Sequence, residues 1–217
     1  MRYKAVLFDL DGTLLDTLED LGNAVNRVLA KRGFPPHSIE SYRHFIGDGA
    51  ALLISRALPE ERRDDESIQS CLEEFRRDYS RSWRVKTKAY DGVTEMLKSL
   101  KARGLKMAIL SNKPDDFTKR SVKALLPHRV FRAVLGEREG IPRKPHPAGA
   151  LEVAERLRVP PRDFLYLGDS SVDMKTAIAA GMTPIGVLWG FRSAKELLDG
   201  GAHRLIERPE EVISLLG

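Results

Sequence analysis

The sequence predicts an α/β fold: a doubly wound, mainly parallel sheet with a helical domain inserted near its start. From residue 90 onward, short apolar runs alternate with amphipathic segments, which is typical of parallel strands covered by helices on both faces. Before that point, a long stretch shows only helical periodicity. The 217 residues are 42% hydrophobic, which is enough for a core of this size.

The first strand is expected at residues 5–8, because this run is apolar without alternation, as in a strand buried on both faces. The stretch after it has no evident strand before residue 87, and Asp16 or Thr17 is the expected N-cap of its first helix. Four helices are expected there, at residues 17–31, 38–45, 50–58 and 67–83. The predicted division is a core of residues 1–14 and 88–217 and a helical insertion of residues 15–87.

Strands and helices then alternate along the rest of the chain. Strands are expected at residues 106–110, 130–135, 164–167 and 183–187, with a weaker one at 204–206. Helices are expected at residues 93–103, 115–126, 148–157 and 172–180, with a final helix that begins at Pro209. This order brings the strand-to-helix loops to one edge of the sheet, where open α/β sheets bind ligands.

Composition argues against several classes of protein. The formal charge is +5 and the isoelectric point about 9.3, but acids and bases are mixed and aromatics are only 7%, so we expect no nucleic-acid partner. The single cysteine, Cys71, cannot form an internal disulfide, which suits a reducing compartment. No apolar run has the length of a signal peptide or a membrane span. We therefore expect a soluble, cytoplasmic protein without a membrane partner, either a monomer or a homodimer.

Polar side chains follow the predicted strands at their carboxyl ends. Carboxylates without a His or Cys cluster suit a hard cation such as Mg²⁺, and a hydroxyl and a lysine suit a bound phosphoryl group. One carboxylate can attack phosphorus to form an aspartyl-phosphate, and a second can transfer the proton. The segments, in chain order, are Asp9-Leu10-Asp11-Gly12-Thr13, Ser111-Asn112-Lys113, Arg143-Lys144-Pro145 and Gly168-Asp169-Ser170-Ser171-Val172-Asp173.

Each segment also has a purely structural interpretation. These interpretations are a turn at Asp11-Gly12, a helix cap at Ser111, a solvated side chain at Lys144, and a capping box at Ser170 and Asp173. Independent turns and caps have no reason to fall in this order after successive strands. Together, the segments therefore favour one shared site.

The four segments resemble, in type, order and spacing, the four motifs of the haloacid dehalogenase-like hydrolase superfamily. The resemblance implies a Rossmann-like core of that superfamily's type and a phosphoryl transfer that needs Mg²⁺. The implied roles are nucleophile for Asp9, general acid/base for Asp11, phosphoryl binding for Ser111 and charge neutralisation for Lys144. The implied Mg²⁺ ligands are the Asp9 carboxylate, the Asp11 backbone carbonyl and Asp169, with Asp173 holding a water bound to the metal. The dehalogenases of the superfamily lack an acid at the position of Asp11.

The helical insertion resembles the cap of the phosphoglycolate phosphatase-like subfamily, as do residues 45–50, 111–114 and 189–193. The residues expected to bind substrate on this basis are Gly12, Thr13, Asn112, Gly47, Gly49 and Arg56. For the last three, a plain helix–helix turn and a surface arginine remain open as alternatives.

The resemblance implies a small phosphorylated metabolite as substrate, and 2-phosphoglycolate is the best single expectation. Within the same superfamily, the alternatives are another sugar-phosphate phosphatase, a β-phosphoglucomutase-like phosphomutase and a pyrophosphatase. An alternative outside the enzymes is a signalling domain that carries a long-lived phosphoaspartate.

Overall fold

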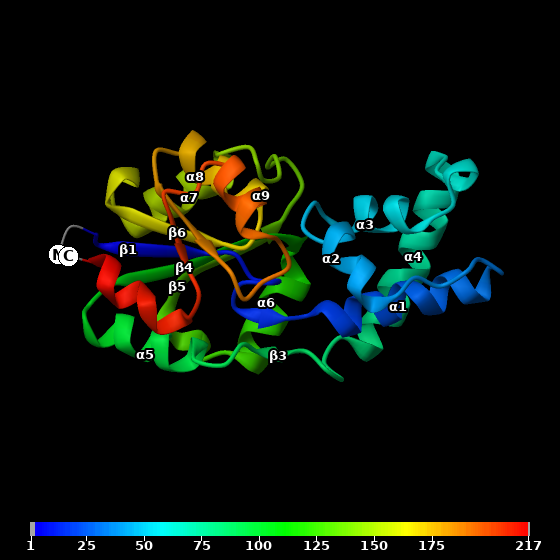
Figure 1. Ribbon diagram of the computed structural model, residues 1–217, viewed down its shortest axis with the longest axis horizontal. Coiled ribbons are helices and arrows are strands. Elements are labelled where there is room, and N and C mark those ends of the chain that lie inside the picture. The colour runs from blue at the N-terminus through cyan, green and yellow to red at the C-terminus, as the bar shows by residue number, and fades with distance from the viewer. Residues whose placement is uncertain (1–2, 217) are drawn as a thin grey trace. The chain divides into compact units, whose positions relative to one another are not determined.

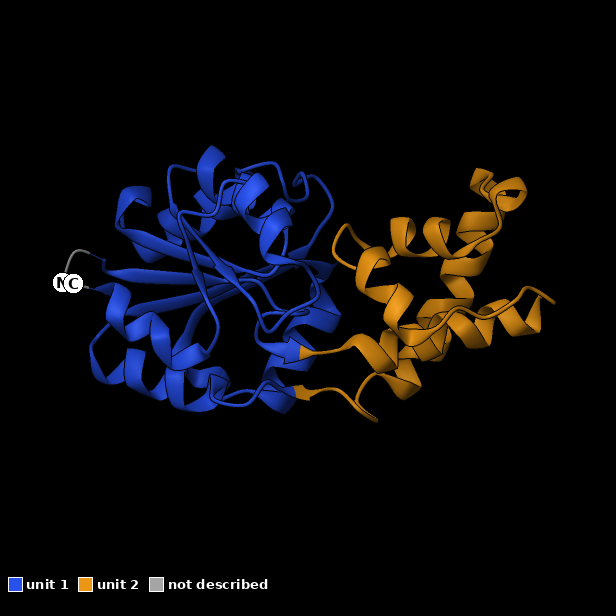
Figure 2. Ribbon diagram, viewed as in Figure 1, with its two compact units in different colours: residues 1–15, 89–217 blue, residues 16–88 orange. Residues whose placement is uncertain are grey.

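A computed structural model describes residues 3–216 and divides the chain into two compact units. Unit 1 consists of Met1–Leu15 and Ala89–Gly217, and unit 2 consists of Asp16–Lys88 (Figure 2). None of the helices within residues 3–216 has both the length and the apolar character that a membrane crossing requires.

Unit 1 contains a six-stranded parallel sheet with the order β5-β4-β1-β6-β7-β8 (Figure 1). The chain adds β4 and β5 on one side of β1 and then adds β6, β7 and β8 on the other, so the winding direction changes beside β1. This arrangement confirms the predicted α/β class. The strands are β1 (Ala5–Phe8), β4 (Lys106–Pro114), β5 (Phe131–Glu137), β6 (Phe164–Gly168), β7 (Thr183–Val187) and β8 (Arg204–Ile206).

Helices cover both faces of this sheet. On β1, Val6 and Phe8 belong to the apolar cluster that includes α5, α6 and the C-terminal η5, whereas Ala5 and Leu7 belong to the cluster that includes α7 and α8. Alternation along one strand therefore fills two cores. The elements are α5 (Val93–Ala102), α6 (Asp115–Leu125), η3 (His128–Val130), α7 (Ala148–Leu157), η4 (Pro161–Asp163), α8 (Ser171–Ala179), α9 (Ala194–Asp199) and η5 (Pro209–Leu216).

Unit 2 is helical. Its long helices α1 (Leu18–Lys31) and α4 (Asp65–Ser82) pack together, and Arg32, the C-cap residue of α1, pairs with Glu74 of α4. The shorter elements are η1 (Ile39–Ser41), α2 (Tyr42–Phe45), α3 (Ala50–Ala57) and η2 (Glu60–Arg62).

The two chain segments that join the units are tied to each other. The short strands β2 (Leu15–Asp16) and β3 (Lys88–Ala89) pair to form a separate two-stranded sheet. The buried carboxylate of Asp20 on α1 accepts hydrogen bonds from the backbone N–H of Lys86 at 2.9 Å and of Thr87 at 2.8 Å, and from the Thr87 hydroxyl at 2.8 Å. Each end of the insertion is thereby held by the other.

Several expectations about individual elements were wrong. The stretch before residue 87 does contain a strand, β2, which is too short to leave a pattern in the sequence. The helix expected at residues 38–45 is a 3-10 turn followed by the short α2, and the last helix is of the 3-10 type. Helix α9 was not foreseen. Of the two capping candidates, Asp16 accepts a bond from the Leu18 N–H, while Thr17 makes no side-chain cap bond.

Candidate active site

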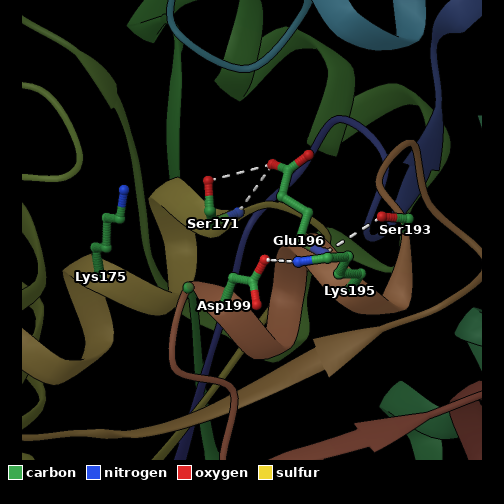
Figure 3. Close-up of a pocket in the computed structure, with 7 residues that line it drawn as sticks. Ser171, Lys175, Ser193, Lys195, Glu196 and Asp199 are labelled. Atoms are coloured by element: carbon green, nitrogen blue, oxygen red, sulfur yellow. Dashed lines mark hydrogen bonds and ion pairs between the residues drawn. The ribbon is translucent and has the colours of Figure 1, made fainter.

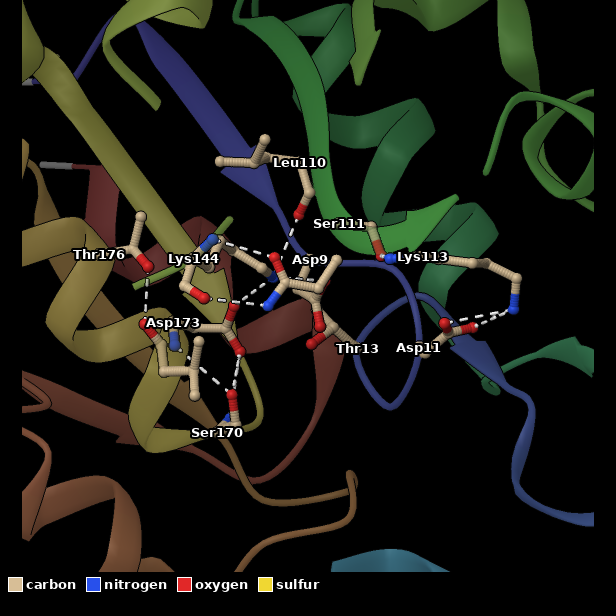
Figure 4. Close-up of polar contacts among 12 residues, drawn as sticks. Asp9, Asp11, Thr13, Leu110, Ser111, Lys113, Lys144, Ser170, Asp173 and Thr176 are labelled. Atoms are coloured by element: carbon tan, nitrogen blue, oxygen red, sulfur yellow. Dashed lines mark hydrogen bonds and ion pairs between the residues drawn. The ribbon is translucent and has the colours of Figure 1, made fainter. Parts of the chain in front are cut away.

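The strand-end segments of unit 1 meet where the winding direction of the sheet changes. Asp9 directly follows β1, Ser111 lies near the end of β4, and Lys144 lies in the loop after β5. Asp169 follows β6, and Asp173 lies in the first turn of α8. All five side chains are buried. Figure 4 shows Asp9 between a group around Lys144 and Asp173 on one side and Asp11 on the other.

The turn after β1 is folded tightly around one carbonyl oxygen. The Leu10 carbonyl accepts bonds from the N–H groups of Thr13, Leu14 and Leu15 at 3.3, 3.0 and 2.9 Å. Gly12 has φ +84°, and a Cβ there would overlap the Asp169 carboxylate, so both backbone conformation and space require glycine. The Thr13 hydroxyl lies 3.4 Å from Oδ1 of Asp169, the residue that directly follows β6.

Lys144 is the central cation of the site. Its Nζ donates to Asp9 Oδ1 and to Asp173 Oδ1, both at 2.7 Å, and to the Leu110 carbonyl at 3.2 Å. Burial alone would lower the pKa of Lys144, but the Asp173 and Asp9 carboxylates raise it well above its ordinary value. The ammonium therefore stays charged and holds the two carboxylates together.

Asn112 fixes the backbone of this lysine. Its Nδ2 donates to the Lys144 carbonyl at 3.1 Å, and its Oδ1 accepts from the Lys144 N–H at 2.9 Å. The amide thus satisfies both backbone groups of Lys144, which links the end of β4 to the loop after β5. The expected contact of Asn112 with substrate stays a prediction.

Three carboxylates crowd together beside Lys144. Asp9, Asp169 and Asp173 each offer an oxygen, and these oxygens lie within 4.8 Å of one another. Burial, and after it the Asp173 carboxylate, raises the pKa of Asp169 to about 7. Burial also raises the pKa of Asp9 well above its ordinary value, although Lys144 opposes that effect. Repulsion of this kind is relieved by a cation, so the cluster fits a divalent metal ion with oxygen ligands.

Asp173 also forms the capping box with Ser170 that its structural interpretation predicted. Its Oδ2 accepts from the Ser170 N–H at 3.2 Å and from the Ser170 hydroxyl at 2.7 Å, and the Asp173 N–H returns a bond to that hydroxyl. A capping box therefore opens α8. Because Lys144 takes the other oxygen, both oxygens of Asp173 have protein partners at 2.7 Å.

Asp11 lies apart from the three-carboxylate cluster and has its own cation. Lys113 Nζ lies 3.0 and 3.2 Å from the two Asp11 carboxylate oxygens. The pairing of Lys113 with Asp11 was not predicted from the sequence, although Lys113 belongs to the same strand-end segment as Ser111. Ser111 does not cap α6, which begins after Pro114; its hydroxyl accepts from the Lys113 N–H at 3.2 Å.

The segment that follows β7 closes the site around Asp169, a contribution that the sequence did not reveal. The Phe191 N–H donates to Asp169 Oδ2 at 2.8 Å, and the Trp189 indole donates to the Thr13 carbonyl at 2.9 Å. Between them, Gly190 packs so closely that a Cβ would overlap both Asp169 and the Gly12 carbonyl. Only a residue without a side chain fits between these two loops.

The other expected substrate residues, Gly47, Gly49 and Arg56, belong to unit 2. Both glycines have positive φ, at +122° and +93°, as a tight connection between helices requires. Arg56 forms an ion pair with Asp48 at 2.6 Å and donates to the Phe45 carbonyl at 3.1 Å. Arg56 therefore braces the loop that carries the glycines.

A separate hollow of about 330 Å³ lies between α8 and α9 (Figure 3). Its charged side chains largely pair with one another: Glu196 accepts from Ser171, and Lys195 pairs with Asp199. None of the clustered carboxylates lines it. The strand ends, rather than this hollow, therefore carry the chemically reactive groups.

Comparison with known proteins agrees with this geometry. The family model described as haloacid dehalogenase-like hydrolase matches residues 6–187. A phosphoglycolate phosphatase from Xylella fastidiosa (strain Temecula1) is 39% identical over 208 residues, which cover 95% of this chain and 90% of that protein. A phosphoglycolate phosphatase from Pseudomonas putida is 35% identical over 198 residues, with 89% and 72% covered.

Solved structures agree as well. A crystal structure of a provisionally assigned phosphoglycolate phosphatase from Lactobacillus delbrueckii subsp. bulgaricus superposes with a TM-score of 0.93 at 32% identity, covering 100% of this chain and 99% of that one. The chain belongs to the haloacid dehalogenase-like hydrolase family and is a phosphatase similar to phosphoglycolate phosphatases.

Proposed function

We propose that this protein is a Mg²⁺-dependent phosphomonoester hydrolase that acts through a phosphoaspartate at Asp9, with 2-phosphoglycolate as its best substrate. The observation that carries the proposal is the setting of Asp9: a buried carboxylate at the switch of the sheet, held by Lys144 and crowded by two further aspartates. A carboxylate fixed in this way is oriented for attack and needs positive charge beside it.

The chemistry divides between the two carboxylates of the first loop. An Asp9 oxygen forms a bond to phosphorus as the bond from phosphorus to the leaving oxygen breaks, and Asp11 gives its proton to that oxygen. Water then attacks the phosphorus, its proton passes to Asp11, and the bond from phosphorus to Asp9 breaks. The Ser111 hydroxyl and the Lys144 ammonium supply a donor and a positive charge for the phosphoryl oxygens.

The carboxylates of Asp9 and Asp169 and the backbone carbonyl of Asp11 are the groups that we propose to hold Mg²⁺. When bound, the ion would neutralise charge on the phosphoryl group and on the carboxylates. The raised pKa of Asp169, which is due first to burial and then to the Asp173 carboxylate, supports this assignment, because a buried carboxylate ionises more readily beside a cation. Asp173, whose oxygens are taken by Lys144 and Ser170, is assigned to orienting the lysine and to water near the ion.

The substrate assignment rests on similarity. Both curated relatives described above are phosphoglycolate phosphatases. We propose that residues 1–14 and 88–217 form the catalytic core and that residues 15–87 form a cap, whose loop around Gly47 and Gly49 contacts the part of the substrate away from the phosphoryl group. Lids of this kind commonly exclude water and select substrates.

The test is Asp9→Asn, assayed with Mg²⁺ and an aryl phosphate. The variant should lose activity to background and should form no phosphoprotein that hydroxylamine cleaves, because the amide cannot replace the carboxylate as nucleophile. Asp199→Asn, which alters an exposed aspartate on α9, is the matched control and should keep full activity. Activity of Asp9→Asn near that of the wild type would refute the assignment.

A phosphate-release screen over phosphorylated metabolites then tests the substrate. Preference for a hexose phosphate, net isomerisation without phosphate release, or hydrolysis of pyrophosphate would each replace 2-phosphoglycolate by one of the alternatives. A phosphoaspartate that persists without turnover would instead indicate a signalling domain.

A further inference from the structure

Lys113 forms a buried ion pair with Asp11 that the proposed mechanism does not use. Its Nζ contacts both oxygens of the Asp11 carboxylate, at 3.0 and 3.2 Å. The exposed fractions of the two side chains are only 5% and 13%. Burying an unpaired ammonium costs free energy. The Asp11 carboxylate is the partner that offsets this cost for Lys113.

The backbone of β4 explains how Lys113 reaches Asp11. Strand β4 pairs with β1 in parallel register, with Phe8 opposite Ile109, so the residues just beyond this pair end up side by side. Lys113 lies two residues beyond Ser111 near the end of β4, and its N–H donates to the Ser111 hydroxyl. The strand that presents the phosphoryl-binding hydroxyl therefore also presents the ammonium to Asp11.

The two aspartates of the first loop are thus held by different lysines. Lys144 contacts Asp9 and Asp173, whereas Lys113 contacts Asp11 (Figure 4). Contact with both oxygens restrains the position of the Asp11 carboxylate and the direction in which its oxygens face. Proton transfer to a leaving oxygen depends strongly on such orientation, because the carboxyl group must point at the atom that receives the proton.

We propose that Lys113 is a positioning residue that orients Asp11 for proton transfer. This inference rests on the proposed function, in which the Asp11 proton goes to the leaving oxygen as the phosphorus–oxygen bond breaks. Lys113 acts through Asp11 and makes no contact of its own with the substrate. While one Asp11 oxygen carries the proton, the ammonium can keep its hold on the other.

The test compares leaving groups in Lys113→Met. An alkyl phosphate has a poor leaving group that needs the proton, whereas p-nitrophenyl phosphate has a good one that leaves without it. The ratio kcat/KM reports the step in which the phosphoryl group moves to Asp9. Because a well-placed general acid contributes about 10²–10⁴-fold, we expect kcat/KM for the alkyl ester to fall by at least about tenfold. For the aryl ester, the loss should stay below about threefold, which also demonstrates that the variant is folded.

The control variant is Lys119→Met, which removes an exposed lysine–aspartate pair from the neighbouring helix α6 and should leave both esters unaffected. Lys113→Gln, which keeps a neutral donor, serves as a second variant should methionine prevent folding. Equal losses on both esters in every folded Lys113 variant, or no loss on the alkyl ester, would overturn the proposal.

A double-mutant comparison separates positioning from direct contact. In an Asp11→Asn background, Lys113→Met should have less than about a twofold further effect on the alkyl ester, because the residue through which it acts is already changed. A further loss as large as that in the wild-type background would contradict the proposal. If the wild-type protein turned over neither ester, the proposed function would fail instead, and the two failures are therefore distinguishable.

Discussion

The substitution Asp169→Asn should stabilise the metal-free protein, although it removes a carboxylate from the candidate metal site. Asp169 is almost fully buried, and its oxygens accept from the Phe191 N–H and lie near the Thr13 hydroxyl. Asparagine has nearly the same shape, its carbonyl oxygen can accept the Phe191 bond, and it carries no charge. The variant therefore keeps the packing and removes a charge that burial and the Asp173 carboxylate both disfavour.

The size and the pH dependence of the effect follow from the pKa. The pKa of Asp169 rises from an ordinary value of 3.8 to about 7 in the folded protein. The folded state then binds more protons than the unfolded state between these values, so stability declines as the pH rises from 3.8 toward 7. Since one pKa unit corresponds to about 1.4 kcal/mol, the ionised group costs the folded protein about 4 kcal/mol at about pH 8, and under about 1 kcal/mol near pH 4.

The assay is thermal unfolding of both proteins in a chelator across this pH range. The variant should melt roughly 10 °C above the wild type at about pH 8, and the difference should nearly vanish near pH 4. Mg²⁺ should raise the melting temperature of the wild type by mass action and have little effect on the variant. A difference that does not vary with pH, or an equal response of both proteins to Mg²⁺, would refute the reasoning.

Two other substitutions probe the packing of the site. Lys144→Met should abolish activity and lower the free energy of unfolding by about 3–5 kcal/mol, because Asp9 and Asp173 would be left buried without their cation. Urea denaturation measures the loss of stability, and a loss below about 1 kcal/mol would contradict the prediction. Gly190→Ala should reduce activity by at least about tenfold, because the added Cβ would overlap Asp169 and displace it. Steady-state kinetics measures the activity, and near-normal activity would show that the loop around residue 190 can move to accept the side chain without loss of function.

The parts of the fold that could be predicted depend on local pattern. The apolar run of β1 and the two carboxylates at its end are adjacent in the chain, so the sequence places them together without knowledge of the rest. The capping box of Ser170 and Asp173 spans four residues and was visible for the same reason. Strand β2 was missed, because two residues carry no periodicity that distinguishes a strand from a turn.

Partnerships between distant residues could not be predicted. Lys113 and Asp11 are separated by 102 residues, and their meeting depends on the register between β1 and β4. The bonds between the Asn112 amide and the backbone of Lys144, 32 residues away, left no sign in the sequence, and the substrate contact expected of Asn112 stays a prediction. Gly190 likewise gives no local sign that a second loop requires its lack of a side chain.

The contacts of Asp20 have a consequence for how this protein could be re-engineered. Through Asp20, Lys86 and Thr87, together with the pairing of β2 with β3, the entry and exit strands of the insertion are fastened to each other within a few residues of where they leave unit 1. Because the two ends of the insertion are bonded to each other, a replacement segment needs only to present its ends at the same separation. We therefore expect that residues 16–88 can be replaced by another insertion whose ends are joined in this way, and the proposed division into core and cap predicts that such chimeras take their substrate preference from the inserted part.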